Sequence, residues 1–300
     1  MPTKKNLKES FAIIGAGKVG SAIGCLLKNA GYPIVSIADL SGRNARRGMK
    51  YTGAKIYKDV VEAAAQAPNI LIATPDDAIL SVCAEISEGG AVKKGNRVVH
   101  LSGAGGLDLL EPARRLGAHV AGIHPLQTFA DVESAIRNIR GSAFGVTADD
   151  EIRNWAFQIV DDIGGIPFSI SEAEKPLYHA AACMASNYLI TLIHIVENIY
   201  LSLGLDQEAA LRAFWPLVEG TMQNIKTGGC VNSLTGPISR GDAGTIRKHL
   251  DVLKTKAPHV MDFYRTMGIL TVDIVEKKGT LSEDKAGLLK SILSGGIRNE

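Results

Sequence analysis

Short apolar runs alternate with amphipathic segments over the first 170 residues of the chain. Eight runs have the length of β-strands and are rich in Val, Ile, Leu and Ala; they lie at residues 11–15, 34–40, 54–57, 69–75, 96–103, 119–125, 142–148 and 165–171. Segments with helical spacing separate most of these runs. Because continuous apolar strands that alternate with helices indicate a parallel sheet covered on both faces, the pattern predicts a doubly wound α/β domain.

Strand patterns stop after Ser171, and the rest of the chain carries helical periodicity. Helices are expected at roughly 174–203, 206–226, 242–253, 257–277 and 282–294. The change of pattern predicts two domains: a Rossmann-like dinucleotide-binding domain over residues 1–170 and an all-α domain over residues 171–300. The second domain has more apolar positions, for example in "ALRAFWPLVEG", than we expect it to bury alone. We therefore expect it to bind substrate and to form a homodimer.

Composition and charge narrow the class of function. The 300 residues are 46% hydrophobic and 21% charged with a formal net charge of +2, so nothing favours nucleic acid or a membrane surface as a partner. The longest apolar run, Ala180–Val196, contains Asn187 and His194 and is short for a membrane span. The four cysteines are scattered without a C-x-x-C pair, so we expect no metal site. These features predict a cytoplasmic protein with a small-molecule substrate.

The motif "GAGKVG" follows the first predicted strand directly and opens the first predicted helix. In this context each glycine has a mechanical role: Gly15 permits the tight turn, Gly17 lets the backbone approach a pyrophosphate, and Gly20 lets helix and strand pack closely. The helix start then offers free N–H groups to the anion. The predicted cofactor-binding loop comprises Gly15, Ala16, Gly17, Lys18, Val19 and Gly20.

Asp39 ends the second predicted strand, about twenty residues after the glycine motif, where an acid binds the adenosine ribose in NAD enzymes. The same residue could instead cap the following helix. Three arginines come next and could hold a 2′-phosphate; they are Arg43, Arg46 and Arg47. The cofactor is therefore predicted to be NAD or NADP, with NAD favoured.

Two later strands end in loops that should line the nicotinamide end of the cofactor. Ligands of doubly wound sheets bind outside the carboxyl ends of the strands. This rule assigns Thr74, Pro75 and Ser102 to cofactor binding, and Ser102 also to catalysis because glycines around it allow close approach. Asp76 reads equally well as a helix N-cap. His124 follows another strand at the same edge and is either a catalytic or a structural histidine.

With these loops placed, the sequence resembles Rossmann-like NAD(P)-binding proteins whose C-terminal helical domain is a domain of unknown function. These proteins are distant relatives of ketopantoate reductase and pyrroline-5-carboxylate reductase. The segments that carry the resemblance are "GAGKVG", "TPDDAI", "VVHLSGA", "GIHPLQTF", "EKPLYHAAACMASN" and "LTGPISRGDAGTIRKHL". The resemblance implies the fold, a nicotinamide cofactor and a dehydrogenase or reductase activity.

Ketopantoate reductase-like enzymes carry a lysine, followed by asparagines at helical spacing, on the first helix after the Rossmann domain. Lys175 matches that lysine, whereas His179 and Cys183 stand at the next two positions. This difference leaves the substrate open, and Asn187, one turn further on, is the candidate for the missing amide.

The helix around Lys175 has two possible starts. "SEAE" reads as a capping box from Ser171 to Glu174, whereas Pro176 favours a helix that begins near Glu174. In both cases Lys175 and His179 share one face and could supply a proton to an alkoxide formed by hydride transfer. Alternatively, Lys175 extends to solvent and His179 seals the domain interface.

Arg240 lies among Gly, Pro and Ser residues, which predicts a loop position suited to bidentate capture of a substrate carboxylate. Asp242 reads as the N-cap of the following helix. Together these features predict an NAD(P)-dependent oxidoreductase that acts on a small oxo or hydroxy acid in the interdomain cleft. The alternative is a non-catalytic NAD(P)-binding sensor.

Overall fold

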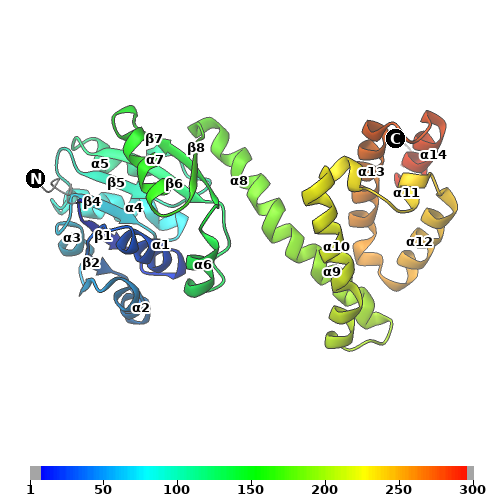
Figure 1. Cartoon of the computed structure of the whole chain (residues 1–300), viewed down its shortest axis with the longest axis horizontal. Helices are drawn as coiled ribbons and strands as arrows, with labels where there is room; N and C mark the ends of the chain where they lie inside the picture. Colours follow the sequence, from blue (N-terminus) through cyan, green and yellow to red (C-terminus); the bar gives the residue numbers. More distant parts are fainter. Residues whose placement is uncertain (1–7, 296–300) are drawn as a thin grey trace, which may run out of the picture. The chain divides into compact units, whose positions relative to one another are not determined.

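The computed structural model describes residues 8–295. The chain forms two compact units, one ending at Tyr188 and the other beginning at Leu189 (Figure 1). The division lies later than the predicted boundary after residue 170, because the helix that follows the last strand starts against the sheet. Its first residue, Lys175, is buried in the first unit.

The first unit contains one sheet in the order β3-β2-β1-β4-β5-β6-β7-β8, the arrangement of a doubly wound fold. Each of the eight predicted apolar runs forms one strand. The strands are β1 (Phe11–Ile14), β2 (Ile34–Ala38), β3 (Lys55–Tyr57), β4 (Asn69–Ile72), β5 (Arg97–His100), β6 (His119–Pro125), β7 (Ala143–Ala148) and β8 (Ile166–Ser169).

The direction of the last two strands corrects the prediction of a wholly parallel sheet. β7 pairs with β6 in the antiparallel sense, and β8 is parallel to β7. Parallel neighbours need a crossover that returns the chain to the opposite edge of the sheet. The connection from β6 to β7 contains α6 (Val132–Asn138), which packs on α1 (Lys18–Asn29), and the chain re-enters the sheet at the end where β6 stops.

Helices cover both faces of the sheet (Figure 1). Alternation along β1 sends Ile13 into one core and Ile14 into the other, and both are fully buried. Besides α1 and α6, the helices of this unit are α2 (Gly42–Thr52), α3 (Val60–Ala64), α4 (Asp76–Glu88), η1 (Leu107–Leu110), α5 (Glu111–Arg114), η2 (Asp150–Ile152), α7 (Arg153–Asp162), η3 (Glu172–Glu174), α8 (Lys175–Cys183) and a π-helical turn, η4 (Met184–Tyr188).

Both signals for the start of α8 are satisfied at once. The Glu174 carboxylate accepts bonds from the Ser171 hydroxyl at 2.5 Å and from its backbone N–H at 3.3 Å, as in a capping box. The capped turn is η3, and α8 then begins with Pro176 in its first turn. The helical stretch Glu172–Ser202 is long and apolar enough to cross a membrane by length and composition alone, and no part of its most apolar window is buried.

The second unit is all-helical and has its own small core, which includes Ile246, Val272 and Leu289. Asp242 caps α12, as predicted: its carboxylate accepts a 2.9 Å bond from the Thr245 N–H. Arg240 ends a short helix and does not lie in a loop. The helices are α9 (Leu189–Ser202), α10 (Gln207–Ser233), α11 (Pro237–Arg240), α12 (Ala243–Lys256), η5 (Pro258–Val260), α13 (Met261–Lys278) and α14 (Glu283–Leu293).

Candidate functional site

The glycine motif has the geometry expected between β1 and α1. Gly15 has φ +97, which only glycine adopts without strain, and a Cβ there would lie 2.6 Å from the Ala73 carbonyl carbon. A Cβ at Gly20 would lie 2.1 Å from the Gly15 oxygen, so the tight turn and the close packing are confirmed. A Cβ at Gly17 would meet no atom within 4 Å. Gly17 therefore leaves open space at the N-terminus of α1, where a pyrophosphate is expected.

Asp39 binds the backbone around the glycine motif. One carboxylate oxygen accepts a 2.7 Å bond from the Ala16 N–H. The other accepts bonds from the Ser41 N–H at 2.7 Å and from the Asn44 amide at 3.3 Å. Since a carboxylate offers about four acceptor positions, most of the capacity of Asp39 is already used.

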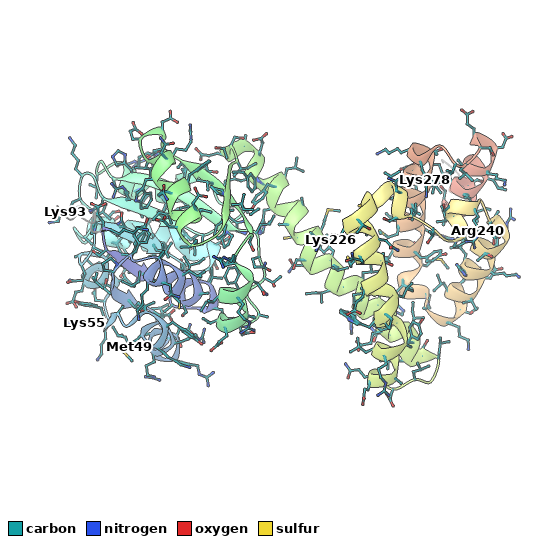
Figure 2. All side chains as sticks on the ribbon, in the orientation of Figure 1. Met49, Lys55, Lys93, Lys226, Arg240 and Lys278 are labelled. Atoms are coloured by element: carbon teal, nitrogen blue, oxygen red, sulfur yellow. The ribbon has the colours of Figure 1, made fainter. Side chains whose placement is uncertain are left out.

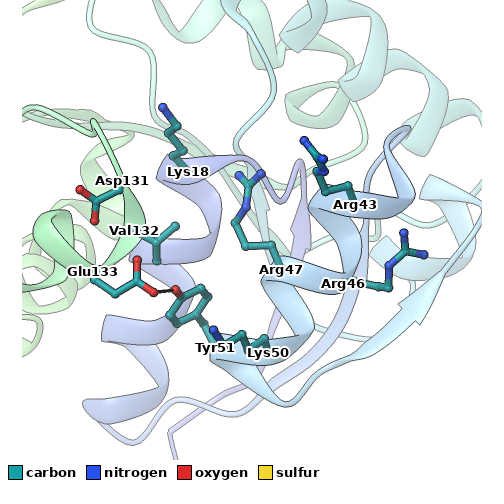
Figure 3. Close-up of a pocket in the computed structure, with 9 residues that line it drawn as sticks. All are labelled: Lys18, Arg43, Arg46, Arg47, Lys50, Tyr51, Asp131, Val132 and Glu133. Carbon is teal, nitrogen blue, oxygen red and sulfur yellow. Dashed lines mark hydrogen bonds between the residues drawn. The ribbon is translucent and has the colours of Figure 1, made fainter.

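A groove rich in cations is lined by residues of α1, α2 and α6, and we call it the basic groove (Figure 3). Arg43 and Arg47 point toward Lys18, whereas Arg46 points away from it. No described residue forms an ion pair with any of the five cations that line the groove, namely Lys18, Arg43, Arg46, Arg47 and Lys50. The groove has a volume of about 540 Å³ and is lined by Lys18, Arg43, Arg46, Arg47, Lys50, Tyr51, Asp131, Val132 and Glu133.

The loops after β4 and β5, which were predicted to line the nicotinamide end of the cofactor, meet through Ser102 and Asp76. The Ser102 hydroxyl donates a 2.7 Å bond to Asp76 and accepts a 2.8 Å bond from the Gly105 N–H. Pro75, rather than Asp76, occupies the N-cap position of α4. The Thr74 hydroxyl oxygen is buried and has no hydrogen-bond partner among the described residues. An unpaired buried hydroxyl at this strand end is available to a ligand.

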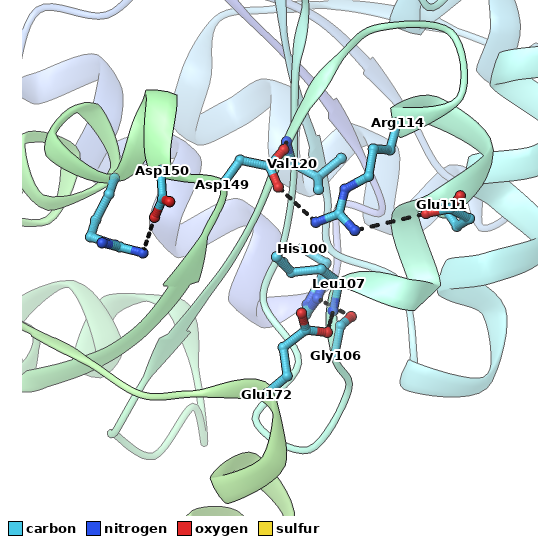
Figure 4. A network of polar contacts seen from close by, with 10 residues as sticks. His100, Gly106, Leu107, Glu111, Arg114, Val120, Asp149, Asp150 and Glu172 are labelled. Carbon is cyan, nitrogen blue, oxygen red and sulfur yellow. Dashed lines mark hydrogen bonds and ion pairs between the residues drawn. The ribbon is translucent and has the colours of Figure 1, made fainter.

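His100 is a buried site residue that the sequence reasoning missed (Figure 4). Its Nε2–H donates to the Gly106 carbonyl at 3.1 Å, and its Nδ1 accepts from the Ser102 N–H at 3.1 Å. Burial, aided by the nearby Lys175 charge, lowers the pKa of His100 to about 4. The available signal was a histidine that ends an apolar strand directly before the predicted ligand loop.

Lys175 lies beside this loop and is 0% exposed. Its Nζ donates a 3.2 Å bond to the Ser102 carbonyl. Burial lowers the pKa of Lys175, and the more distant charges of Asp76 and Glu172 oppose that shift. The structure therefore excludes the alternative in which Lys175 extends to solvent.

His124 and two residues of α8 form the next part of the site. The His124 Nδ1 lies 2.8 Å from the Tyr178 hydroxyl, and its ring lies edge-on to that of His179 with centroids 5.7 Å apart. Burial, with His179 as the next cause, lowers the pKa of His124 to about 4. A Cβ at Gly103 would lie 2.8 Å from His124 and 2.4 Å from His179, so both rings close on the glycine loop.

Other predicted residues lie elsewhere. Asn187 is an exposed residue of the π-helical turn η4. The His179 Nδ1 lies 3.9 Å from the Cys183 sulfur, in keeping with the shared helix face. Arg240 belongs to the helical second unit and is exposed (Figure 2). Its role in substrate binding stays a prediction.

Comparison with known families supports the two-part organisation. Residues 3–125 match the model of a Rossmann-like domain, and residues 142–271 match a domain of unknown function, DUF2520. No curated protein matches the sequence.

Solved structures share the fold over most of the chain. A protein from Bacteroides fragilis assigned as an NADP oxidoreductase is 20% identical over 90% of this chain and 98% of its own, with a TM-score of 0.73. A protein from Thermotoga maritima is 25% identical over 89% and 99%, with a TM-score of 0.68. A pyrroline-5-carboxylate reductase from Coxiella burnetii is 19% identical over 95% and 98%, with a TM-score of 0.57. The predicted distant similarity to pyrroline-5-carboxylate reductase is thereby confirmed.

The two glycines Gly17 and Gly20 should respond differently to alanine. Gly17→Ala places a methyl group in open space, so Tm should change little while cofactor affinity falls at least tenfold because the methyl blocks the pyrophosphate. Gly20→Ala collides with the Gly15 oxygen and should lower Tm. Thermal melts and cofactor titration check both variants. Unchanged cofactor binding by Gly17→Ala would show that the open space is not the pyrophosphate position.

Proposed function

We propose that this chain, which joins a Rossmann-like domain to a domain of unknown function (DUF2520), is a nicotinamide-dependent reductase of a small oxo acid. The observation that carries the proposal is the buried Lys175 ammonium at the carboxyl edge of β4, β5 and β6. That edge is where a doubly wound sheet binds the reactive end of its ligand. Burial there lowers the pKa of the lysine, which makes its proton easier to transfer.

Each part of the site has a role in this proposal. The reduced nicotinamide supplies the hydride when it is bound. The loop from Gly15 to Gly20 and the helix end behind it hold the pyrophosphate. Ser102, fixed by Asp76, orients the reacting end, and Lys175 gives its proton to the oxygen that becomes a hydroxyl.

A carboxylate on the substrate is the finer part of the proposal. Arg240 is a free-standing cation in the second unit, without an ion pair to a described residue, and is suited to a bidentate carboxylate bond. A reductase with this fold acts on pyrroline-5-carboxylate, a small carboxylate. Optical assays of NADPH and NADH oxidation over a panel of 2-oxo acids and cyclic imino acids test the proposal. Tight cofactor binding without turnover on the whole panel would favour the sensor instead.

Lys175→Met should reduce turnover about 10²–10⁴-fold, the usual contribution of general acid–base catalysis. Cofactor affinity should change little, and Tm should stay level or rise because a buried charge is replaced by an apolar chain of similar length. In the wild type, turnover should fall as pH rises through the lowered pKa of Lys175, because the donor loses its proton there. Steady-state kinetics and thermal melts measure these effects.

The matched control is Lys93→Met, which changes an exposed lysine in the turn before β5, at the opposite end of that strand from the Ser102 loop. It should retain wild-type turnover. If Lys175→Met kept more than about a tenth of the activity, general acid catalysis by this lysine would be rejected, since the loss of such an acid should lower the activity at least about a hundredfold.

We further propose NADP(H) as the preferred cofactor, where the sequence alone favoured NAD. Asp39 uses three acceptor positions on backbone and Asn44 groups, which leaves it little capacity for ribose hydroxyls. Arg43 and Arg47 stand one helical turn apart and point toward Lys18 without a carboxylate partner (Figure 3). A 2′-phosphate would give these two arginines an anionic partner.

Arg47→Ala should weaken NADPH binding about ten- to hundredfold, the usual effect of one charge-assisted hydrogen bond, and leave NADH binding nearly unchanged. Arg140→Ala is the control, because Arg140 is an exposed arginine that does not line the basic groove. Fluorescence titration of both variants with both cofactors gives the four affinities. Wild-type protein that binds NADH more tightly than NADPH would overturn the preference.

Dimerisation through the helical unit is a separate proposal. Within "ALRAFWPLVEG", Ala210 and Phe214 are buried, whereas Leu211, Trp215 and Leu217 are exposed. A groove of about 320 Å³ between α9 and α10 is lined by Leu189, Ile193, Trp215, Val218, Glu219, Met222, Gln223 and Lys226. A second copy related by a twofold axis suits this groove, because Glu219 of one copy can then face Lys226 of the other.

Wild-type protein should sediment as a dimer at micromolar concentration, and Met222→Glu should sediment as a monomer because it places a charge in the apolar groove. Met267→Glu is a closely matched control: Met267 and Met222 are both 43% exposed, but Met267 does not line the groove. That variant should remain dimeric. A monomeric wild type, or equal behaviour of the two variants, would reject this interface.

A further inference from the structure

His100 connects the strand β5 to the loop that bears Ser102, and its two ring nitrogens have separate tasks. Nδ1 accepts from the Ser102 N–H, and Nε2–H donates to the Gly106 carbonyl, each at 3.1 Å. The first bond holds the peptide unit between Leu101 and Ser102 and so anchors Ser102 at the start of the loop, and the second holds the loop at Gly106. The loop is held from the other side by Glu172, whose carboxylate accepts a 2.9 Å bond from the Leu107 N–H (Figure 4).

Ser102 is also where Lys175 is held. The Lys175 Nζ donates to the carbonyl of Ser102, while His100 binds the N–H of the same residue. The described residues provide Lys175 with no carboxylate within ion-pair distance. The position of the Ser102 carbonyl therefore decides how well a protein group replaces water as the hydrogen-bond partner of the buried ammonium.

Gly122 on the neighbouring strand β6 makes room for both groups. A Cβ at this position would lie 2.9 Å from the His100 ring and 3.3 Å from the Lys175 Nζ. The imidazole and the ammonium thus occupy one niche over a bare stretch of backbone. Two cations in a buried niche repel each other, so the niche holds one charge when the ring is neutral.

The hydrogen bonds of His100 keep the ring neutral. A proton on Nδ1 would remove the acceptor for the Ser102 N–H, and two donors would face each other. The charged and titratable groups that face His100 from the surrounding elements are Lys175 on α8, Asp76 at the start of α4, Asp108 on η1 and His124 on β6. Of these four groups, the Lys175 ammonium is the positive charge that lies next to the His100 ring in the niche.

We propose that His100 is a positioning residue for Lys175: through Nδ1 it anchors Ser102 by its N–H, which limits where the carbonyl of Ser102, in the following peptide unit, can point and so keeps that carbonyl on the ammonium. As a neutral ring, His100 also adds no second positive charge to the niche. The effect on turnover rests on the proposed function. The effect on the protonation of Lys175 does not.

Two neutral amide variants separate the two nitrogens of His100. In His100→Asn the amide oxygen can take the place of Nδ1 and keep the bond from the Ser102 N–H. In His100→Gln the amide nitrogen can take the place of Nε2 and keep the bond to the Gly106 carbonyl. Both variants remove the ring, so their difference reports which bond matters to Lys175.

The primary measurement is an NMR titration of the full chain with a carbon-13 label at lysine Cε, with the Lys175 signal assigned from its loss in Lys175→Met. We expect the pKa of Lys175 to stay near its wild-type value in His100→Asn and to fall in His100→Gln, where the ammonium loses its oriented acceptor. Equal pKa values in both variants and the wild type would make His100 a structural residue and overturn the proposal.

Kinetics give the second readout on any substrate that the panel identifies. His100→Gln should lower kcat about tenfold or more, by the loss of an oriented hydrogen bond to a charged group, and should shift the alkaline fall in kcat to lower pH. His100→Asn should do neither, and cofactor affinity should be unchanged in both. A loss of kcat without any shift in the pH profile or in the Lys175 titration would contradict the proposal.

The two proposals fail separately. If wild-type protein turned over no substrate while the Lys175 titration still shifted in His100→Gln alone, the reductase function would fail and the positioning role would stand. If Lys175→Met abolished turnover while both His100 variants behaved as wild type, the positioning role would fail and the reductase function would stand.

Discussion

The buried ammonium of Lys175 is the constraint around which the first unit is arranged. An unpaired charge away from water costs several kcal/mol, and here one carbonyl at 3.2 Å is its direct partner. The surroundings lower that cost in other ways. Neighbouring imidazoles stay neutral, and Asp76 and Glu172 supply negative potential from a distance. A buried ammonium in such a niche loses its proton more readily than an exposed one. This lowers the stability of the fold but suits the lysine to proton transfer.

Three positions around the site are glycines, and a side chain at any of them would come too close to a neighbouring polar ring. Alanine at Gly103 would collide with His124 and His179, and alanine at Gly122 would collide with His100. At Gly145 it would come within 3.0 Å of the Tyr178 hydroxyl. These glycines let polar rings approach the backbone at the carboxyl edge of the sheet. Gly103 of the "SGAGG" loop therefore has a packing role besides any contact with a ligand, as do Gly122 and Gly145 on β6 and β7.

Features that depend on local sequence could be predicted, and features that depend on distant partners could not. The eight strands and the turn at Gly15 follow from periodicity and from one short motif. The antiparallel direction of β7 depends on where α6 packs, which no pattern within β7 records. The role of His100 depends on Lys175, far along the chain. The start of α8 stayed ambiguous because a short 3-10 turn satisfies the capping box and α8 then satisfies Pro176.

The site divides binding and chemistry between two stretches of one sheet edge. In the proposed function the basic groove holds a part of the cofactor that does not react, so its cations would affect ground state and transition state equally. In the same proposal Lys175, held by the Ser102 carbonyl beside β5 and β6, donates the proton, so its effect would fall on the chemical step. Lys175 is bonded to the loop after β5, whereas the groove cations stand on α1 and α2, so the proposal implies that substitutions on α2 alter cofactor choice without moving Lys175. A fold that separates the two regions in this way could keep one proton donor while its cofactor preference changes.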